Sequence, residues 1–222
     1  MAKPADPRPG SNPVPAIKGS VLRSIVEHAR EVCRKRSIPI AELERRLGAG
    51  GAQLLGAEIR ATDWYPVSFY GPLRQFLREV EGGGKDRYTI DSAIEGARRL
   101  IASGIYPQLE FLKQPKTLVD RNADPKARRE LFASQLERVS TIHNALFNFS
   151  RVDVRDDPEH EDRVQLEFRD RGVMPYDGRL AVLGYWLEMS AHLSPTRRGH
   201  LWTKIDAPDH YVLRMTRDIT EL

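Results

Sequence analysis

The spacing of apolar residues changes once along this chain, near residue 147, and that change constrains the fold more than any other feature. Before it, as in residues 21–33, apolar side chains recur every three or four positions, which is the period of an α-helix. After it, as in residues 164–168, they alternate, which is the period of a β-strand. The sequence therefore predicts an α+β protein, with helices first and a sheet last.

Helix-breaking residues divide the first part of the chain. Helical stretches end at glycine-rich segments and before prolines, because glycine and the residue before proline leave helical geometry readily. The end signals are Ser37-Ile38-Pro39, the glycine-rich segments 48–51 and 82–84, and Ser103-Gly104. Trp64-Tyr65-Pro66 reads as a turn, and Pro72 predicts a kink or break in the helix that follows. The predicted helices cover residues 20–37, 40–47, 66–80, 88–101 and 125–144, with an interrupted helical stretch over 105–119.

The second part of the chain reads as β-β-α-β-β. Two strands, over 147–154 and 164–168, flank a polar hairpin loop, and a richly apolar helix over 180–193 follows them. Two more strands surround a turn at 207–209. This pattern predicts one antiparallel sheet with the N-terminal helices packed on one face of it. The last two strands are predicted over residues 200–204 and 211–215.

The N-terminal fifteen residues differ from the rest of the chain. They contain five prolines separated by polar and small residues, and such a segment has little apolar surface to bury. We therefore predict a flexible tail over residues 1–15 and a single α+β domain over residues 16–222, a length that suits one sizeable domain.

Composition excludes several classes of protein. No run of eighteen apolar residues is present, and the N-terminus lacks the apolar stretch of a secretory signal, so the prediction is a cytoplasmic protein without a membrane span. A single cysteine, Cys33, allows neither an intrachain disulfide nor a thiolate metal cage. The net charge of +4 comes from finely interleaved basic and acidic residues, which argues against nucleic acid as a partner.

No known catalytic or metal-binding motif is present. The six histidines do not pair at ligand spacing, and neither glycine-rich segment matches a phosphate-binding loop. The acidic loop 156–162 is either a solvated turn or a site for a hard cation. Residues 41–48 resemble the start of a helix-turn-helix, but the next segment, 52–59, is too apolar to read DNA. We predict no catalytic residue, no metal and no cofactor.

Aromatic residues and one histidine are the candidate ligand-binding residues. They either fill the core between the sheet and the helices or line a cavity there. His143 is either a hydrogen-bonded core histidine or an axial haem ligand. Arg87, Arg98 and Arg99 either supply counter-charge for an acidic ligand or form a solvated face. The candidate ligand-binding residues are Trp64, Tyr65, Tyr106, His143, Tyr185 and Trp186.

Three short segments and the C-terminal pattern carry a family resemblance. The segments are Ile17-Lys18-Gly19-Ser20-Val21-Leu22, Trp64-Tyr65-Pro66-Val67 and Gly104-Ile105-Tyr106. With the β-β-α-β-β ending, they resemble a myxobacterial paralogous family of uncharacterised proteins over residues 17–218. At greater distance, the arrangement is similar to the group that contains haem-nitric-oxide-binding sensors, four-vinyl-reductase ligand-binding domains and Bet3-type tethering subunits.

The resemblance implies an α+β fold, frequent dimerisation, and binding of small molecules or partners rather than catalysis. Two departures limit what carries over. The cysteines of metal-binding four-vinyl-reductase domains are absent, and Tyr65-Pro66-Val67-Ser68-Phe69 does not reproduce the Tyr-x-Ser-x-Arg haem-propionate motif. No metal, haem or catalytic residue is therefore carried over, and residues 115–145 are longer than in the family.

The leading hypothesis from the sequence is a non-enzymatic sensory or scaffolding module. It would bind a small apolar ligand, a protein partner or both, as a homodimer. One alternative is a DNA- or nucleotide-binding regulator, which requires basic residues clustered on one surface. Another is an enzyme with an unrecognised site, which requires a pocket that holds titratable groups with shifted pKa values.

Overall fold

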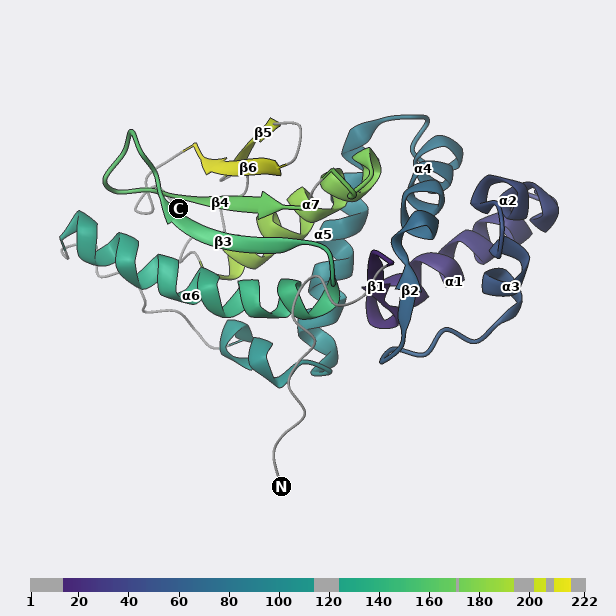
Figure 1. Cartoon of the computed structure of the whole chain (residues 1–222), viewed down its shortest axis with the longest axis horizontal. Helices are drawn as coiled ribbons and strands as arrows, with labels where there is room; N and C mark the ends of the chain where they lie inside the picture. The colour runs from purple at the N-terminus through teal and green to yellow at the C-terminus, as the bar shows by residue number, and fades with distance from the viewer. Residues whose placement is uncertain (1–13, 114–123, 171, 194–201, 207–209, 217–222) are drawn as a thin grey trace, which may run out of the picture.

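The C-terminal strands form a four-stranded antiparallel sheet in the order β3-β4-β6-β5 (Figure 1). The computed structural model describes residues 14–113, 124–170, 172–193, 202–206 and 210–216. In these the sheet consists of β3 (Arg151–Asp156), β4 (Val164–Arg169), β5 (Trp202–Asp206) and β6 (His210–Met215), and α7 (Tyr176–Leu193) connects β4 to β5. The predicted β-β-α-β-β order is therefore confirmed. The turn predicted at 207–209 lies outside the described residues.

The two faces of this sheet have opposite character. Val152, Phe168 and Tyr211 lie side by side across three strands, and all three are buried. Their neighbours along the strands point to the other face, where Asp153 and Glu167 lie among arginines. Helices α6 (Pro125–Leu146) and α7 pack against the sheet, and its buried face supplies part of the apolar core. The alternation of apolar residues thus produced the expected one-sided sheet.

The remaining helices match the helical periodicity of the first part of the chain. They begin and end close to the predicted punctuation, and the predicted α+β class is confirmed. Gly104, which follows α5, has φ of +67°, a left-handed conformation that glycine adopts without steric cost. The helices are α1 (Gly19–Lys35), α2 (Ile40–Leu47), α3 (Gly51–Gly56), α4 (Tyr70–Val80) and α5 (Asp86–Ser103), with 3₁₀ helices at Val67–Phe69 and Pro107–Lys113.

Pro72 behaves differently from the prediction. Pro72 was expected to kink or break a helix that starts at Pro66, but α4 begins at Tyr70 and Pro72 lies in its first turn. The first turn of a helix has backbone N–H groups without partners, so proline loses no hydrogen bond there.

Of the interrupted helical stretch over 105–119, the described residues form the 3₁₀ helix Pro107–Lys113.

A second, two-stranded sheet was not predicted. Strand β1 (Ala16–Lys18) pairs antiparallel with β2 (Trp64–Pro66), where the sequence suggested a turn. Strands of three residues are too short to give a clear alternation, so periodicity could not reveal them. On its other side, β1 meets the end of α6, because Ile17 bridges to Phe147 and the Asn148 amide donates to the Ala16 carbonyl at 3.2 Å.

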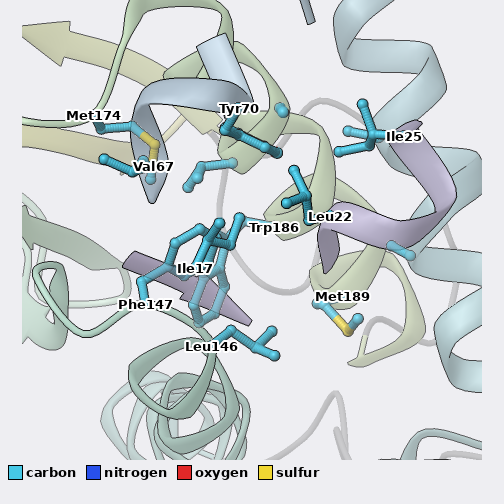
Figure 2. Close-up of a cluster of buried hydrophobic side chains, with 14 of the residues drawn as sticks. Ile17, Leu22, Ile25, Val67, Tyr70, Leu146, Phe147, Met174, Trp186 and Met189 are labelled. Carbon is cyan, nitrogen blue, oxygen red and sulfur yellow. The ribbon is translucent and has the colours of Figure 1, made fainter. Parts of the chain in front are cut away.

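The core lies where the N-terminal helices meet the sheet. Figure 2 shows buried side chains from β1, α1, α4, α6 and α7 converging in one cluster. Ile17, Leu22 and Trp186 within it are fully buried. Phe168 of the sheet lies against the Trp186 ring, with centroids 6.1 Å apart. The cluster therefore joins the helical part to the sheet.

The hairpin loop after β3 is fixed to the sheet by an ion pair. Asp157 accepts hydrogen bonds from Arg214 on both carboxylate oxygens, at 2.7 and 2.8 Å. Its side chain is fully buried, and the Arg214 guanidinium lowers the pKa of that carboxyl to about 2. The prediction of a purely solvated turn is therefore wrong for Asp157, because the guanidinium compensates its burial. Among the described residues no cluster of three or more His, Cys, Asp or Glu side chains is placed to hold a metal.

Helix length and hydropathy bear on the predicted absence of a membrane span. Of the helices that the structure describes, none combines enough length with enough apolar character to cross a bilayer.

Candidate functional site

Five helices meet around a cavity of about 100 Å³. The helices are α1, α4, α5, α6 and α7, so both the N-terminal part and the sheet-packing helices contribute walls. Most of the lining side chains are apolar, and a few are polar or charged. The lining residues are Ser20, Val21, Ser24, Tyr70, Arg74, Ala93, Gly96, Ala97, Leu100, His143, Leu146, Phe147, Ala181, Val182 and Tyr185.

Small residues on α5 and α7 leave this space open. Ala93, Gly96 and Ala97 lie on one face of α5 at spacings of three and four, and Ala181 faces the cavity from α7. A Cβ atom at Gly96 would meet no atom within 4 Å. At Gly184, by contrast, a Cβ atom would lie 2.3 Å from the Ile90 carbonyl oxygen. The two helices therefore touch at Gly184 and stay apart at the cavity.

The Tyr185 hydroxyl is a buried polar group at the cavity. The ring lines the cavity, and the hydroxyl oxygen has no hydrogen-bond partner among the described residues. Burial raises the pKa of this phenol, so it stays protonated and remains a hydrogen-bond donor. A buried hydroxyl without a partner costs about 1–3 kcal/mol, and a ligand that accepts a hydrogen bond would remove that cost.

His143 forms part of the cavity wall as a neutral imidazole. It is almost fully buried, and its Nε2 lies 3.1 Å from Ser150 Oγ. Burial lowers the pKa of His143 to about 3, because the interior disfavours the charged ring. The Phe147 and Phe168 rings lie 4.7 and 5.5 Å away, centroid to centroid. This environment is that of a hydrogen-bonded core histidine.

A haem does not fit beside His143. The cavity of about 100 Å³ is smaller than the cavity of roughly 150 Å³ that holds a single benzene ring in another protein. A tetrapyrrole is several times larger than benzene. The Nε2 atom that would approach an iron lies within hydrogen-bond distance of Ser150 Oγ.

Arg74 is the charged residue of the cavity wall. Its guanidinium carbon lies 5.4 Å from the Tyr70 ring centroid, and Nη1 donates a long hydrogen bond of 3.4 Å to Ser92 Oγ. The Nε atom is buried and has no hydrogen-bond partner in the described part of the chain. Ser20, a polar residue of the cavity wall, forms a hydrogen bond with Tyr106, since its Oγ lies 2.7 Å from the Tyr106 hydroxyl.

The candidate residues from the sequence fall into three groups. His143 and Tyr185 line the cavity, and Tyr106 reaches it through its hydrogen bond with Ser20. Trp186 is fully buried in the core, 5.8 Å from Tyr185 between ring centroids. The remaining two residues, Trp64 and Tyr65, lie on β2.

Trp64 and Tyr65 do not line the cavity. The Trp64 side chain is 37% exposed and lies under the Lys18 ammonium, 4.2 Å from the ring centroid. The Tyr65 hydroxyl accepts a hydrogen bond from the Arg60 amide at 2.9 Å. Trp64 therefore contacts the neighbouring strand of the small sheet, and Tyr65 contacts the segment that precedes β2.

The arginine at the cavity is not one that the sequence singled out. Arg87 pairs with Asp91 and Arg98 with Glu188, at 2.8 and 3.0 Å, while Arg99 is exposed. None of the three lines the cavity. Arg74 could have been found from its place in α4, four residues after Tyr70 and three before Leu77, both of which are buried. A charged residue at the edge of an apolar stripe is the signal that was missed.

A second group of titratable residues lies on the surface. His28 Nε2 lies 2.6 Å from Glu81 Oε2, and the Tyr88 hydroxyl donates to the same oxygen. The His28 side chain is 45% exposed. Burial and this carboxylate raise the pKa of Tyr88, so Tyr88 is not poised to lose its proton. We interpret the three residues as a contact that ties the end of α4 to α1 and α5.

Comparisons with protein-family models, with curated proteins and with solved structures give no significant match to this chain. The family resemblance described from the sequence therefore stays a prediction.

Proposed function

We propose that this protein is a non-enzymatic binding module, sensory or scaffolding, that holds a small apolar ligand in the five-helix cavity. The observation that carries the proposal is the Tyr185 hydroxyl, a buried donor without a partner among the described residues at a mostly apolar wall. Ligand sites commonly combine such walls with a few polar groups that fix orientation.

The protonation states of the cavity residues favour binding over catalysis. An effective general acid or base has a pKa near the working pH. Burial moves the pKa values of two cavity residues away from that range, since the pKa of His143 falls to about 3 and that of Tyr185 rises. Both side chains are neutral throughout the physiological range and neither exchanges a proton readily there.

A homodimer or protein partner and a cytoplasmic location belong to the same proposal. They rest on the resemblance and on the composition. The large apolar side chains that are exposed among the described residues lie on different elements, for example Ile40 on α2, Trp64 on β2 and Leu131 on α6. Sedimentation velocity of the full chain tests the dimer, and a monomer at all concentrations would remove it.

Filling the cavity tests the proposed binding site. Ala97 lines the cavity and is buried, so Ala97→Leu should occupy most of its volume. We expect the variant to keep its circular dichroism spectrum and to lose ligand binding. Native mass spectrometry of the purified protein reports any ligand that stays bound, and titrations with small neutral probes such as butyramide, which has a short aliphatic chain, report the affinity.

The matched control is Ala102→Leu. Ala102 lies on the same helix but is exposed, so the same change there should leave binding intact. Equal affinity of the Ala97→Leu variant and the unmodified protein would contradict the proposed site, as would the absence of any bound ligand or probe in the unmodified protein.

A further inference from the structure

Arg74 differs from Arg78 and Arg214, two other arginines that are partly buried in this fold. Arg78 donates to Asp177 at 2.7 Å, and Arg214 donates to Asp157 at 2.7 Å. Within the described residues no carboxylate oxygen lies within 4 Å of the Arg74 guanidinium. A partly buried cation at an apolar wall without a counter-charge is unfavourable, so this position suits an anion supplied from outside the chain.

The donors around Arg74 are not saturated. The Nε atom has no hydrogen-bond partner among the described residues, and the bond from Nη1 to Ser92 Oγ is long, at 3.4 Å. The serine oxygen is also neutral. A guanidinium presents its N–H groups in a planar fork that matches the two oxygens of a carboxylate. Arg74 therefore has both the charge and the free donors to bind one.

The size of the cavity limits the rest of the ligand. About 100 Å³ is less than the roughly 150 Å³ of a cavity that holds benzene, so the apolar body contains on the order of four carbons. The lining also includes Ala97, Leu100, Leu146 and Val182, whose side chains offer only apolar contacts. They suit an aliphatic chain.

We propose that the cavity binds a short-chain aliphatic carboxylate. The carboxylate pairs with Arg74, the Tyr185 hydroxyl donates a hydrogen bond to the ligand, and the aliphatic chain fills the space beside Ala97. This inference rests on the proposed function, because it names the ligand class of the same cavity. It goes further in stating that the ligand is an anion.

Three probes of the same size and different charge test the inference on the full-length protein. These are butyrate, butyramide and butylamine, titrated at neutral pH and followed by amide chemical shifts. We expect butyrate to bind at least tenfold more tightly than butyramide, and butylamine to bind more weakly than both. The butyrate affinity should also fall as salt is added, because salt screens the ion pair.

Two variants assign the preference to Arg74. Arg74→Met keeps the length and apolar volume of the side chain, so we expect it to lose the preference for butyrate and to keep the affinity for butyramide. Arg99→Met, an exposed position on α5, should behave like the unmodified protein. If Arg74→Met does not fold, the comparison of butyrate with butyramide on the unmodified protein still decides the question.

The possible results separate this inference from the proposed function. Equal binding of butyrate and butyramide, or a butyrate preference that survives in a folded Arg74→Met variant, would overturn the assignment of a carboxylate to Arg74 and leave a neutral-ligand site. Absence of binding by every probe would overturn both the inference and the proposed binding function.

Discussion

At the scale of single residues, burial decides how His143 responds to acid. The ring is almost fully buried, and its pKa is about 3, well below the ordinary value of 6.5. In the unfolded chain the same ring takes up a proton near pH 6.5. Below that pH the unfolded state binds one more proton than the folded state, so folding becomes less favourable as the pH falls.

The pH dependence of stability should therefore contain a contribution from His143. We expect the free energy of unfolding to fall by about 2 kcal/mol from this residue between pH 7 and pH 5. The loss continues until the pH approaches the folded pKa of about 3. Urea denaturation at several pH values measures it. The variant His143→Gln cannot titrate, and its stability should decline less steeply over the same interval, whatever its absolute value. Parallel curves for the two proteins would contradict this assignment.

At the scale of elements, α5 and α7 are held together by close approach at one glycine. A Cβ atom at Gly184 would lie 2.3 Å from the Ile90 carbonyl oxygen and 2.9 Å from Ala93 Cβ. Both distances are shorter than van der Waals contact, so the backbone would have to move to admit the Cβ atom. A larger residue there would push α7 away from α5, and the helices that surround the cavity would separate.

Two glycine-to-alanine changes on these helices should have opposite effects on stability. Gly184→Ala should lower the free energy of unfolding by about 1–3 kcal/mol, because the added methyl group overpacks the contact. Gly96→Ala should raise it by about 0.5–1 kcal/mol, because the new methyl group meets no atom within 4 Å and alanine favours the helix. Thermal and urea denaturation measure both changes. A stabilised Gly184→Ala variant would show that the helices are less closely packed than described.

Long elements could be predicted from the sequence and short ones could not. Helix α2 was predicted with the bounds Ile40–Leu47 that the structure has, because a stripe of apolar residues and clear stop signals define it. Strands β1 and β2 have three residues each, which is too few to show a period. The aromatics of the turn-like segment at 64–66 were therefore assigned to a pocket that they do not line.

The candidate site was predictable in part for a related reason. His143 and Tyr185 lie on helices whose apolar periodicity indicates a face toward the core, and both line the cavity. The role proposed for Arg74 depends on the absence of a nearby carboxylate in the folded chain, among the described residues. The openness of the cavity depends on how α5 and α7 pack at Gly184. Both are properties of tertiary packing, which spacing along one helix does not report.

At the scale of the whole molecule, β1 joins the helical part to the sheet-packing helix α6. The Ala16 amide donates to Asn148 Oδ1 at 2.7 Å, and the Asn148 side-chain amide donates to the Val14 carbonyl at 3.3 Å. Figure 1 shows β1 between these two parts of the molecule. A single asparagine after α6 thus holds the start of the fold in place.

Removing the Asn148 side chain should loosen β1 selectively. We expect Asn148→Ala to lower the free energy of unfolding by about 1 kcal/mol, since two hydrogen bonds are lost and the Ala16 amide is left without this acceptor. Hydrogen exchange should become faster in residues 14–18 and in their partner strand β2. Gln108→Ala, an exposed position, serves as the control. Unchanged exchange across 14–18 would show that β2 alone fixes this strand.

The walls of the five-helix cavity come from residues as far apart as Ser20 and Tyr185. Every intervening α-helix except α2 and α3 supplies a wall, and β1, which precedes α1, contacts the residues that follow α6. Fragments obtained by proteolysis or by dissecting the gene would each lack at least one side of the chamber. A minimal recombinant version that keeps it must therefore span nearly the entire polypeptide, including the strands β5 and β6 that complete the sheet.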